Sequence, residues 1–326
     1  MSKQPLIDQL DIAISQIVAD PGVQIASADA AVLDLLGVAR DLRKLPRPDF
    51  KARLKAELER KASMSTKMTT KTVLYRPGFR TVTPYLLPPN EGFIDFLKNV
   101  FGAVETERTD TSPTSFHAEV QIGDSMLMMG VGSGRSMPVN LQVYVPNVDE
   151  IYERALAAGS TSLLAISENY GDRFGVVEDP AGNQWVIATH LGAHYIPENL
   201  HTITGWFHPK GAPQFIDFLK RAFSAEELER YDLPDGGVKH AKIRIGDSVV
   251  ALSEPHDDWK PMPMMVYLYV PNVDELYQQA LRAGAKSLSE PKDQVYGDRS
   301  AGIQDEWGNM WYMATPLGGP SESTVR

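Results

Sequence analysis

The chain has 326 residues, of which 43% are hydrophobic and 23% are charged, and this is the composition of a globular protein long enough for two or three domains. Its formal net charge of −10 argues against nucleic acid as the main partner, because phosphate binding needs a basic face, and the absence of cysteine excludes disulfides and thiol catalysis. Neither a signal peptide nor an apolar run of membrane-spanning length is present, so we expect a cytoplasmic protein with no membrane partner.

Residues 1–66 are predicted to form a helical N-terminal segment. Apolar side chains recur there every three or four residues, and Pro21, Pro46 and Pro48 divide the pattern into three amphipathic helices. The apolar stripes must be covered by the rest of the chain or by a second copy, so a homodimer through these helices is one expected arrangement. Recognition of another protein by the same segment is the alternative. Residues 67–78 have the composition of a linker.

A first module, residues 79–190, divides into two similar halves, each with a strand, a helix and three further strands. The predicted elements of the first half are residues 81–87, 91–101, 104–108, 116–122 and 126–129. Those of the second half are residues 139–145, 148–158, 162–166, 174–177 and 185–189.

A second module, residues 203–316, repeats the first. The stretch VPNVDE at 145–150 returns at 270–275, FIDFLK at 93–98 returns at 215–220, and YGDR at 170–173 returns at 296–299. A nearly constant offset in several motifs indicates a tandem duplication. Residues 191–202 are predicted to link the modules, and residues 317–326 to form a tail.

These motifs resemble the vicinal oxygen chelate superfamily, which includes glyoxalase I, bleomycin-resistance proteins and extradiol dioxygenases. With FIDFL on the first helix, HAE at 117–119 before the hairpin GDS at 123–125, and EDPAGNQW at 178–185, they are most similar to its PhnB-like branch. The resemblance implies an α+β fold in which the paired β-α-β-β-β units of each tandem module form a half-open barrel. It also implies a cup that holds a small ligand, often with a divalent metal.

Strand alternation predicts which side chains line the cups. On the strand at 116–122 every second residue is apolar, so His117 and Glu119 share the opposite face. The candidate ligand-binding residues on the polar and aromatic strand faces are Gln142, Tyr144, Trp206, His240, Arg244, Tyr267 and Tyr269. Aromatic walls with a few hydrogen-bonding groups are typical of a small-molecule site. The alternative is a sheet face open to solvent or a seam between modules.

The residues at the metal positions of the family depart from its usual ligands. The resemblance implies His or Gln from the first strand of each half and Glu from the last strand. The corresponding positions fall near Val82, Asn140, Val186, Thr204, Met265 and Tyr312. Four imidazole or carboxylate ligands cannot be assembled from them, so we expect no cofactor. A divalent metal bound by His117 and Glu119, or acid–base catalysis by this pair, stays open.

Arg173 and Arg299 occupy equivalent positions in the two modules. Each could hold a carboxylate or phosphonate ligand through its planar guanidinium. The alternative is structural, with Arg173 paired to Asp179 and Arg299 to Asp305. Their presence in both modules favours the structural interpretation, because a folding requirement applies to each copy.

The sequence therefore favours a glyoxalase/bleomycin-resistance-like protein that binds a small organic ligand in a cup without the usual metal tetrad. A metal-dependent lyase or dioxygenase that uses His117 and Glu119 is the first alternative. An interaction protein that uses residues 1–66 is the second. The fold alone names no ligand or substrate.

Overall fold

Four β-α-β-β-β units follow one another in the computed structural model of the chain. The structure describes residues 76, 78–256 and 259–318, so the predicted helices of residues 1–66 lie outside the described part. The described residues belong to one unit, Thr72–Arg326, and contain sixteen strands and four helices. Each predicted strand and helix of the first module is confirmed, with ends shifted by a few residues. None of these helices is long and apolar enough to cross a membrane.

Each unit has the same order of elements. Unit 1 contains β1 Val82–Leu86, α4 Gly92–Phe101, β2 Val104–Ser112, β3 Ser115–Ile122 and β4 Ser125–Val131. Unit 2 contains β5 Asn140–Tyr144, α5 Val148–Ala157, β6 Thr161–Asn169, β7 Asp172–Glu178 and β8 Gln184–His190. Unit 3 contains β9 Ile203–Phe207, α6 Ala212–Phe223, β10 Glu226–Asp232, β11 Val238–Ile245 and β12 Ser248–Leu252. Unit 4 contains β13 Met265–Tyr269, α7 Val273–Arg282, β14 Lys286–Asp293, β15 Asp298–Gln304 and β16 Met310–Pro316.

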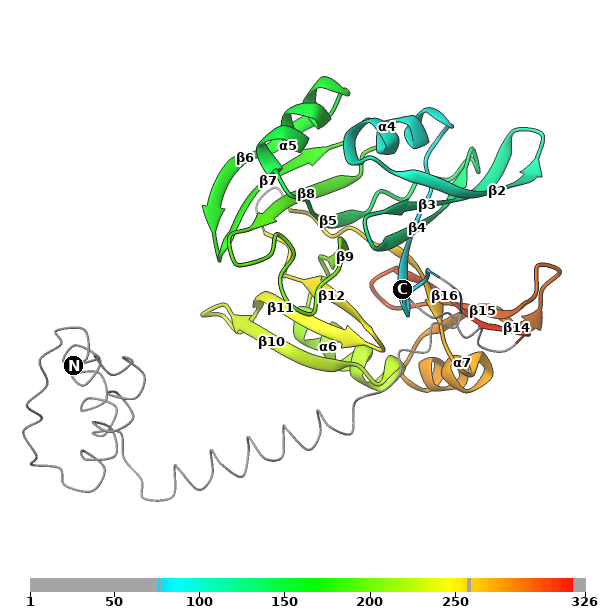
Figure 1. Cartoon of the computed structure of the whole chain (residues 1–326). Coiled ribbons are helices and arrows are strands. Elements are labelled where there is room, and N and C mark those ends of the chain that lie inside the picture. The colour runs from blue at the N-terminus through cyan, green and yellow to red at the C-terminus, as the bar shows by residue number, and fades with distance from the viewer. Residues whose placement is uncertain (1–75, 77, 257–258, 319–326) are drawn as a thin grey trace, which may run out of the picture. The chain divides into compact units, whose positions relative to one another are not determined.

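Two eight-stranded sheets join units from different modules. The first sheet has the order β14-β15-β16-β13-β1-β4-β3-β2, and the second has the order β10-β11-β12-β9-β5-β8-β7-β6. Unit 1 therefore pairs with unit 4, and unit 2 with unit 3. The prediction that the two units of one module share a barrel is wrong. In Figure 1 the second sheet opens to the left, between β6 and β10, and the first opens to the right, between β2 and β14.

The junction in each sheet is an antiparallel pair of first strands. In the first sheet β1 pairs with β13, and Thr83 lies opposite Tyr267. In the second sheet β5 pairs with β9, and Gln142 lies opposite Thr204. Side chains directly opposite each other point to the same face of a sheet. Each concave face therefore receives side chains from both modules.

The two units of one module pack against each other through their helices instead of sharing a sheet. Phe101 at the end of α4 contacts Trp185 of β8, with 4.8 Å between ring centroids, and Phe223 at the end of α6 contacts Trp311 of β16 at 4.6 Å. Both tryptophans are fully buried. Their burial, together with that of the apolar helix faces, holds each module together.

A buried aspartate organises the turn before the last strand of units 2 and 4. Asp305 accepts hydrogen bonds from the backbone N–H groups of Trp307 and Asn309, from the Asn309 amide, and from Trp311 Nε1 at 2.8 Å. Asp179 is bound in the same way by Asn183 and Trp185. Burial raises the pKa of Asp305 to about 6 against the opposing effect of these donors. The motif DxxGNxW is thus a fold determinant.

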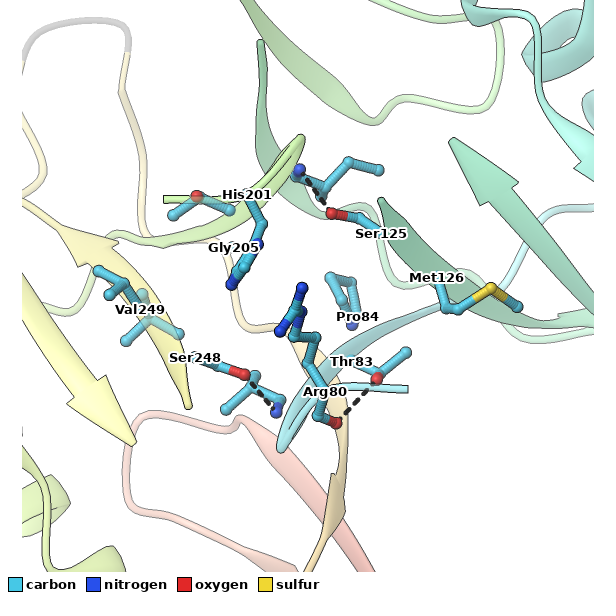
Figure 2. A pocket seen from close by; sticks show the side chains of 13 residues that line it. Arg80, Thr83, Pro84, Ser125, Met126, His201, Gly205, Ser248 and Val249 are labelled. Atoms are coloured by element: carbon cyan, nitrogen blue, oxygen red, sulfur yellow. Dashed lines mark hydrogen bonds between the residues drawn. The ribbon is translucent and has the colours of Figure 1, made fainter. Parts of the chain in front are cut away.

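Hydrogen bonds connect the two sheets at the starts of β1 and β9, the first strands of the two modules. Asp247 and Ser248, in the β11–β12 hairpin of the second sheet, accept hydrogen bonds from the backbone N–H groups of Thr81 and Val82. Asp124 and Ser125 of the first sheet do the same for Thr202 and Ile203. Figure 2 shows this seam, with Arg80 and His201 between the two serines. The hairpins that carry the repeated Gly-Asp-Ser motif therefore fix β1 and β9.

We expect Asp305→Asn to lower the free energy of unfolding by about 3 kcal/mol. The new amide nitrogen would face the N–H groups of Trp311 or Asn309, and buried donors would then lack acceptors. Urea denaturation followed by circular dichroism measures the loss. Asp217→Asn, at an exposed position of α6, is the control and should change stability little. Equal effects of the two substitutions would contradict the role given to Asp305.

Candidate functional site

The concave face of the second sheet, here called the second cup, brings together four of the predicted ligand-binding residues. Gln142 and Tyr144 come from β5, Trp206 from β9 and His240 from β11. The register places Gln142 opposite Thr204, two residues from Trp206 on the same strand. Sequence positions almost 100 residues apart in different modules thus meet on one face because β5 pairs with β9.

Tyr144 is the centre of a hydrogen-bonded chain in the second cup. Its hydroxyl donates to Asp172 Oδ2 at 3.0 Å, and Gln142 Nε2 donates to the Tyr144 oxygen at 3.0 Å. The other Asp172 oxygen lies 2.7 Å from His190 Nδ1. Burial and the Asp172 carboxylate raise the pKa of Tyr144. Tyr144 therefore stays a neutral phenol that donates to Asp172.

Trp206 lies on the other side of the second cup. Its ring centroid is 5.4 Å from that of His240, and its Nε1 donates to Ser253 Oγ at 3.1 Å. Ser253 Oγ lies 3.1 Å from His208 Nδ1, and His208 Nε2 lies 3.3 Å from Asn140 Nδ2. The Trp206 ring is fixed at Nε1 and stacks against His208 at 6.3 Å between centroids, and the residue is half-buried. It is therefore a pre-oriented flat surface inside the cup.

Charges in the second cup neutralise one another. Lys242 Nζ lies 3.0 Å from Glu229 Oε1, and His240 Nε2 lies 3.5 Å from the same oxygen. Burial and the Lys242 charge lower the pKa of His240. His240 is then neutral at pH 7, and the Lys242–Glu229 pair carries no net charge. Arg244, at the hairpin end of β11, pairs with Glu226 at 3.1 Å.

The second sheet curls far enough for its two sides to touch. Lys239 Nζ of β11 lies 5.3 Å from the centroid of the Tyr170 ring, in the turn between β6 and β7. Four strands, β12, β9, β5 and β8, separate β11 from β7 in the sheet. This cation–π contact joins the two sides of the sheet at the surface.

The concave face of the first sheet, the first cup, is richer in aromatic residues. Tyr267 and Tyr269 lie there, 5.1 Å apart between ring centroids, in a cluster separate from the main core. Phe79, from the segment before β1, packs edge-on against Tyr269 at 5.4 Å, and both are buried. The two predicted tyrosines are thus in a different cup from Gln142, Tyr144 and Trp206.

The candidate catalytic pair, His117 and Glu119, also lies in the first cup. His117 Nε2 is 3.3 Å from Glu119 Oε1, and His117 Nδ1 is 3.3 Å from the Tyr85 hydroxyl. The same Glu119 oxygen lies 2.6 Å from Arg76 Nη1. Arg76 precedes β1, in the segment that the sequence indicates as a linker. The Glu119 carboxylate is therefore already paired with a cation.

Arg173 and Arg299 are held by helix carboxylates. Arg173 makes two hydrogen bonds to Asp149 in the first turn of α5, at 2.8 and 2.6 Å, and Arg299 makes two to Asp274 of α7, at 2.6 and 2.7 Å. The predicted partner Asp179 is wrong, because its oxygens accept from Asn183 and Trp185, and Asp305 is bound in the corresponding way. Both guanidiniums therefore tie a strand to a helix.

The donor sets in the cups do not fit the metal site of the family. The first strands contribute Thr83, Tyr267, Gln142 and Thr204 at their paired inner positions. On the last strands, Val186 lies next to Gln142 and Tyr312 next to Tyr267, whereas Met128 lies next to Tyr85 and Ala251 next to Trp206. Among the described residues no group of three or more His, Cys, Asp and Glu could hold a metal ion. The expectation that the protein uses no cofactor stays a prediction.

The described part of the chain also has hollows outside the cups. The seam in Figure 2 encloses about 30 Å³, which is room for about one water molecule. A hollow of about 370 Å³ is lined by His208, Lys210, Met262, Trp307 and neighbouring prolines. The seam is too small for an organic ligand, and the second hollow is built largely from loops.

Sequence reasoning did not find Arg76, Phe79, His208 or the Asp172–His190 pair. His208 lies just after the predicted linker of residues 191–202 and is only 5% exposed. The sequence does contain one indication of Arg76. Glu107 and Glu119 lie on adjacent predicted strands, and two like charges there need a cation nearby. Nothing in the sequence indicates which arginine supplies it.

A model of the glyoxalase/bleomycin resistance protein/dioxygenase superfamily matches residues 210–313. An uncharacterized protein of Mycobacterium bovis is 35% identical in an alignment of 120 positions that covers 32% of this chain and 77% of that protein. The chain belongs to this superfamily. An uncharacterized protein of Mycobacterium tuberculosis strain H37Rv is also 35% identical over 120 residues and is covered over 69% of its length.

Solved structures of this superfamily share the fold. Glyoxalase I from Zea mays has a TM-score of 0.58 at 14% identity, with 72% of this chain and 92% of that chain covered. A putative dioxygenase from Bacillus subtilis has a TM-score of 0.51 at 11% identity, with 73% and 85% covered. At these low identities the similarity to the two solved structures concerns the fold alone.

We expect the buried His208 to make stability depend on pH. Burial lowers its pKa from 6.5 to about 4, so the folded state favours neutral His208, and stability present above pH 6.5 is lost as the pH falls toward 4. Between pH 7 and pH 5 this loss is about 2 kcal/mol. Urea denaturation at both pH values should show a smaller difference in His208→Gln than in the wild type. An unchanged difference, or the same reduction in the control His194→Gln at an exposed position, would contradict this assignment.

Proposed function

We propose that the second cup binds a small, flat organic molecule that carries hydroxyl or carbonyl groups. The Trp206 ring, fixed through Ser253 and partly exposed beside His240, offers a surface for stacking. This pre-oriented ring is the observation that carries the proposal. A ligand stacked on it could place polar groups toward Gln142 and Tyr144 across the β5–β9 junction.

The charges of the second cup favour a neutral ligand. Lys242 and Glu229 pair with each other, Asp172 accepts a hydrogen bond from Tyr144 and lies 2.7 Å from His190 Nδ1, and burial keeps His240 neutral. A charged ligand would have to displace one of these partners and leave a carboxylate or an ammonium without its counter-charge. A neutral ligand that stacks on Trp206 and forms hydrogen bonds with the paired groups displaces none of these partners. The ligand class is therefore a neutral, planar molecule with hydrogen-bonding groups.

Binding alone, rather than metal-dependent chemistry, is the function that these residues support best. A lyase or dioxygenase activity that uses His117 and Glu119 is less well supported, because Arg76 holds the Glu119 carboxylate at 2.6 Å. The PhnB-like branch, the cytoplasmic location and a homodimer through residues 1–66 remain predictions. An interaction role for residues 1–66 concerns a segment outside the described residues.

Resorcinol is the first probe for this proposal, because its flat ring carries two hydroxyl groups. We expect saturable binding to the full chain in ligand-observed NMR, and weaker binding of cyclohexane-1,3-diol, which carries the same hydroxyls on a non-planar ring. Trp206→Ala should weaken resorcinol binding about tenfold or more, on the order of 1.4 kcal/mol. Gln142→Ala should also weaken it, through loss of one hydrogen bond.

Tyr85→Ala is the matched control, because Tyr85 of β1 occupies in the first cup the strand position that Trp206 of β9 has in the second. It should leave resorcinol binding unchanged. The proposal fails if resorcinol and the non-planar diol bind equally, if neither binds, or if Tyr85→Ala weakens binding as much as Trp206→Ala does.

A further inference from the structure

Two carboxylates face each other in the first cup. The register of β2 and β3 places Glu107 directly opposite Glu119, and Glu119 is only 3% exposed. Like charges in this position destabilise a strand pair, and a buried carboxylate needs a cation or several donors. The strands themselves supply neither a lysine nor an arginine at this pair. This part of the first cup therefore requires a cation from elsewhere.

The Arg76 guanidinium supplies that cation. Its Nη1 lies 2.6 Å from Glu119 Oε1 and donates to the Tyr269 hydroxyl at 2.8 Å, while Nη2 lies 3.0 Å from Glu107 Oε2. The guanidinium carbon is 4.4 Å from the centroid of the Phe79 ring and 5.8 Å from that of Tyr269. Two carboxylates, a hydroxyl and two aromatic rings thus surround one guanidinium.

In the second cup the pair equivalent to Glu107 and Glu119 contains its own cation. There the register places Glu229 opposite Lys242, and Lys242 Nζ lies 3.0 Å from the glutamate. Strand β11 carries its own cation where β3 carries Glu119. The first cup therefore differs from its duplicate by presenting two carboxylates to a cation that arrives from outside the sheet.

We infer that the first cup contains a receptor for a guanidinium or alkylammonium group, and that Arg76 occupies it as an internal ligand. Carboxylates and aromatic faces are the groups that recognise such cations, and here each carboxylate meets a different guanidinium nitrogen. A small molecule with a guanidinium group competes with Arg76 for Glu107 and Glu119. This receptor shares no residue with the planar-ligand site of the second cup, so the two proposals can fail separately.

Methylguanidinium is the probe, and Arg76→Ala in the full chain is the variant that vacates the receptor. We expect methylguanidinium at millimolar concentrations to raise the melting temperature of Arg76→Ala progressively with concentration, as a ligand of the native state does. Methylurea has nearly the same shape without the charge and should have no such effect. The wild type should respond much less, because Arg76 competes for the same carboxylates.

Two further variants separate a receptor from a general effect of the salt. Arg76→Ala combined with Glu119→Gln should lose the response, because the buried carboxylate is gone. Arg173→Ala removes an arginine that is held by two hydrogen bonds to an exposed carboxylate outside the cups, and methylguanidinium should not stabilise it. The inference is overturned if all variants respond alike, or if methylurea acts as methylguanidinium does.

If Arg76→Ala does not yield folded protein, refolding from urea is the measurement. Methylguanidinium in the refolding buffer should increase the yield of folded Arg76→Ala severalfold, and methylurea should not. Equal yields with the two compounds would refute the receptor, because the missing guanidinium would then not be the cause of misfolding.

Discussion

The antiparallel pairing of first strands is the constraint on which both cups depend. β1 pairs with β13, and β5 with β9, so each sheet is continuous across the boundary between modules. Without these two junctions each unit would expose the edge of a four-stranded sheet and only half of a concave face. The helices then cover the outer faces, and the apolar helix residues join units of the same module. Each concave face consequently belongs to both modules.

Duplication preserved the core and changed the cups. Trp185 and Trp311 fill equivalent buried positions, and Asp179 and Asp305 hold them through the same hydrogen bond at 2.8 Å. The inner faces differ in chemistry: Trp206 replaces Tyr85, and Lys242 replaces Glu119. A core residue such as Trp185 is fully buried and constrained by close packing on every side, whereas Trp206 and Lys242 are only half-buried. The inner faces could therefore diverge in chemistry without a change of fold.

The sequence alone was sufficient to predict the units but not their pairing. Alternating apolar residues on 116–122 and the repeated VPNVDE turn identify strands and helix starts locally, and Asn147 does cap α5 by accepting from the Glu150 N–H. The first strands of all four units share one pattern, so no periodicity says whether β1 pairs with β5 or with β13. That choice depends on how the helices pack against Trp185 and Trp311, which is a property of the whole chain.

The same limit applies to the candidate site. Strand alternation placed Gln142, Tyr144, Trp206 and His240 on inner faces, because side-chain direction in a strand depends only on position. It could not show that they share one cup and that Tyr267 and Tyr269 line the other. Strand alternation also could not identify the carboxylates that pair with Arg173 and Arg76. An ion pair between distant residues depends on three-dimensional proximity, and any of several carboxylates satisfied the sequence pattern equally well.

The seam between the sheets makes the two cups mechanically dependent on each other. β1, which carries Tyr85 of the first cup, is anchored at its start by Asp247 and Ser248 of the second sheet. β9, which carries Trp206 of the second cup, is anchored by the equivalent hairpin of the first sheet. Gly246 approaches Thr81 so closely that a Cβ there would lie 2.3 Å from the threonine hydroxyl. Position 246 therefore has no room for a side chain, and the hydrogen bonds to Asp247 and Ser248 couple the start of β1 to the hairpin of the other sheet.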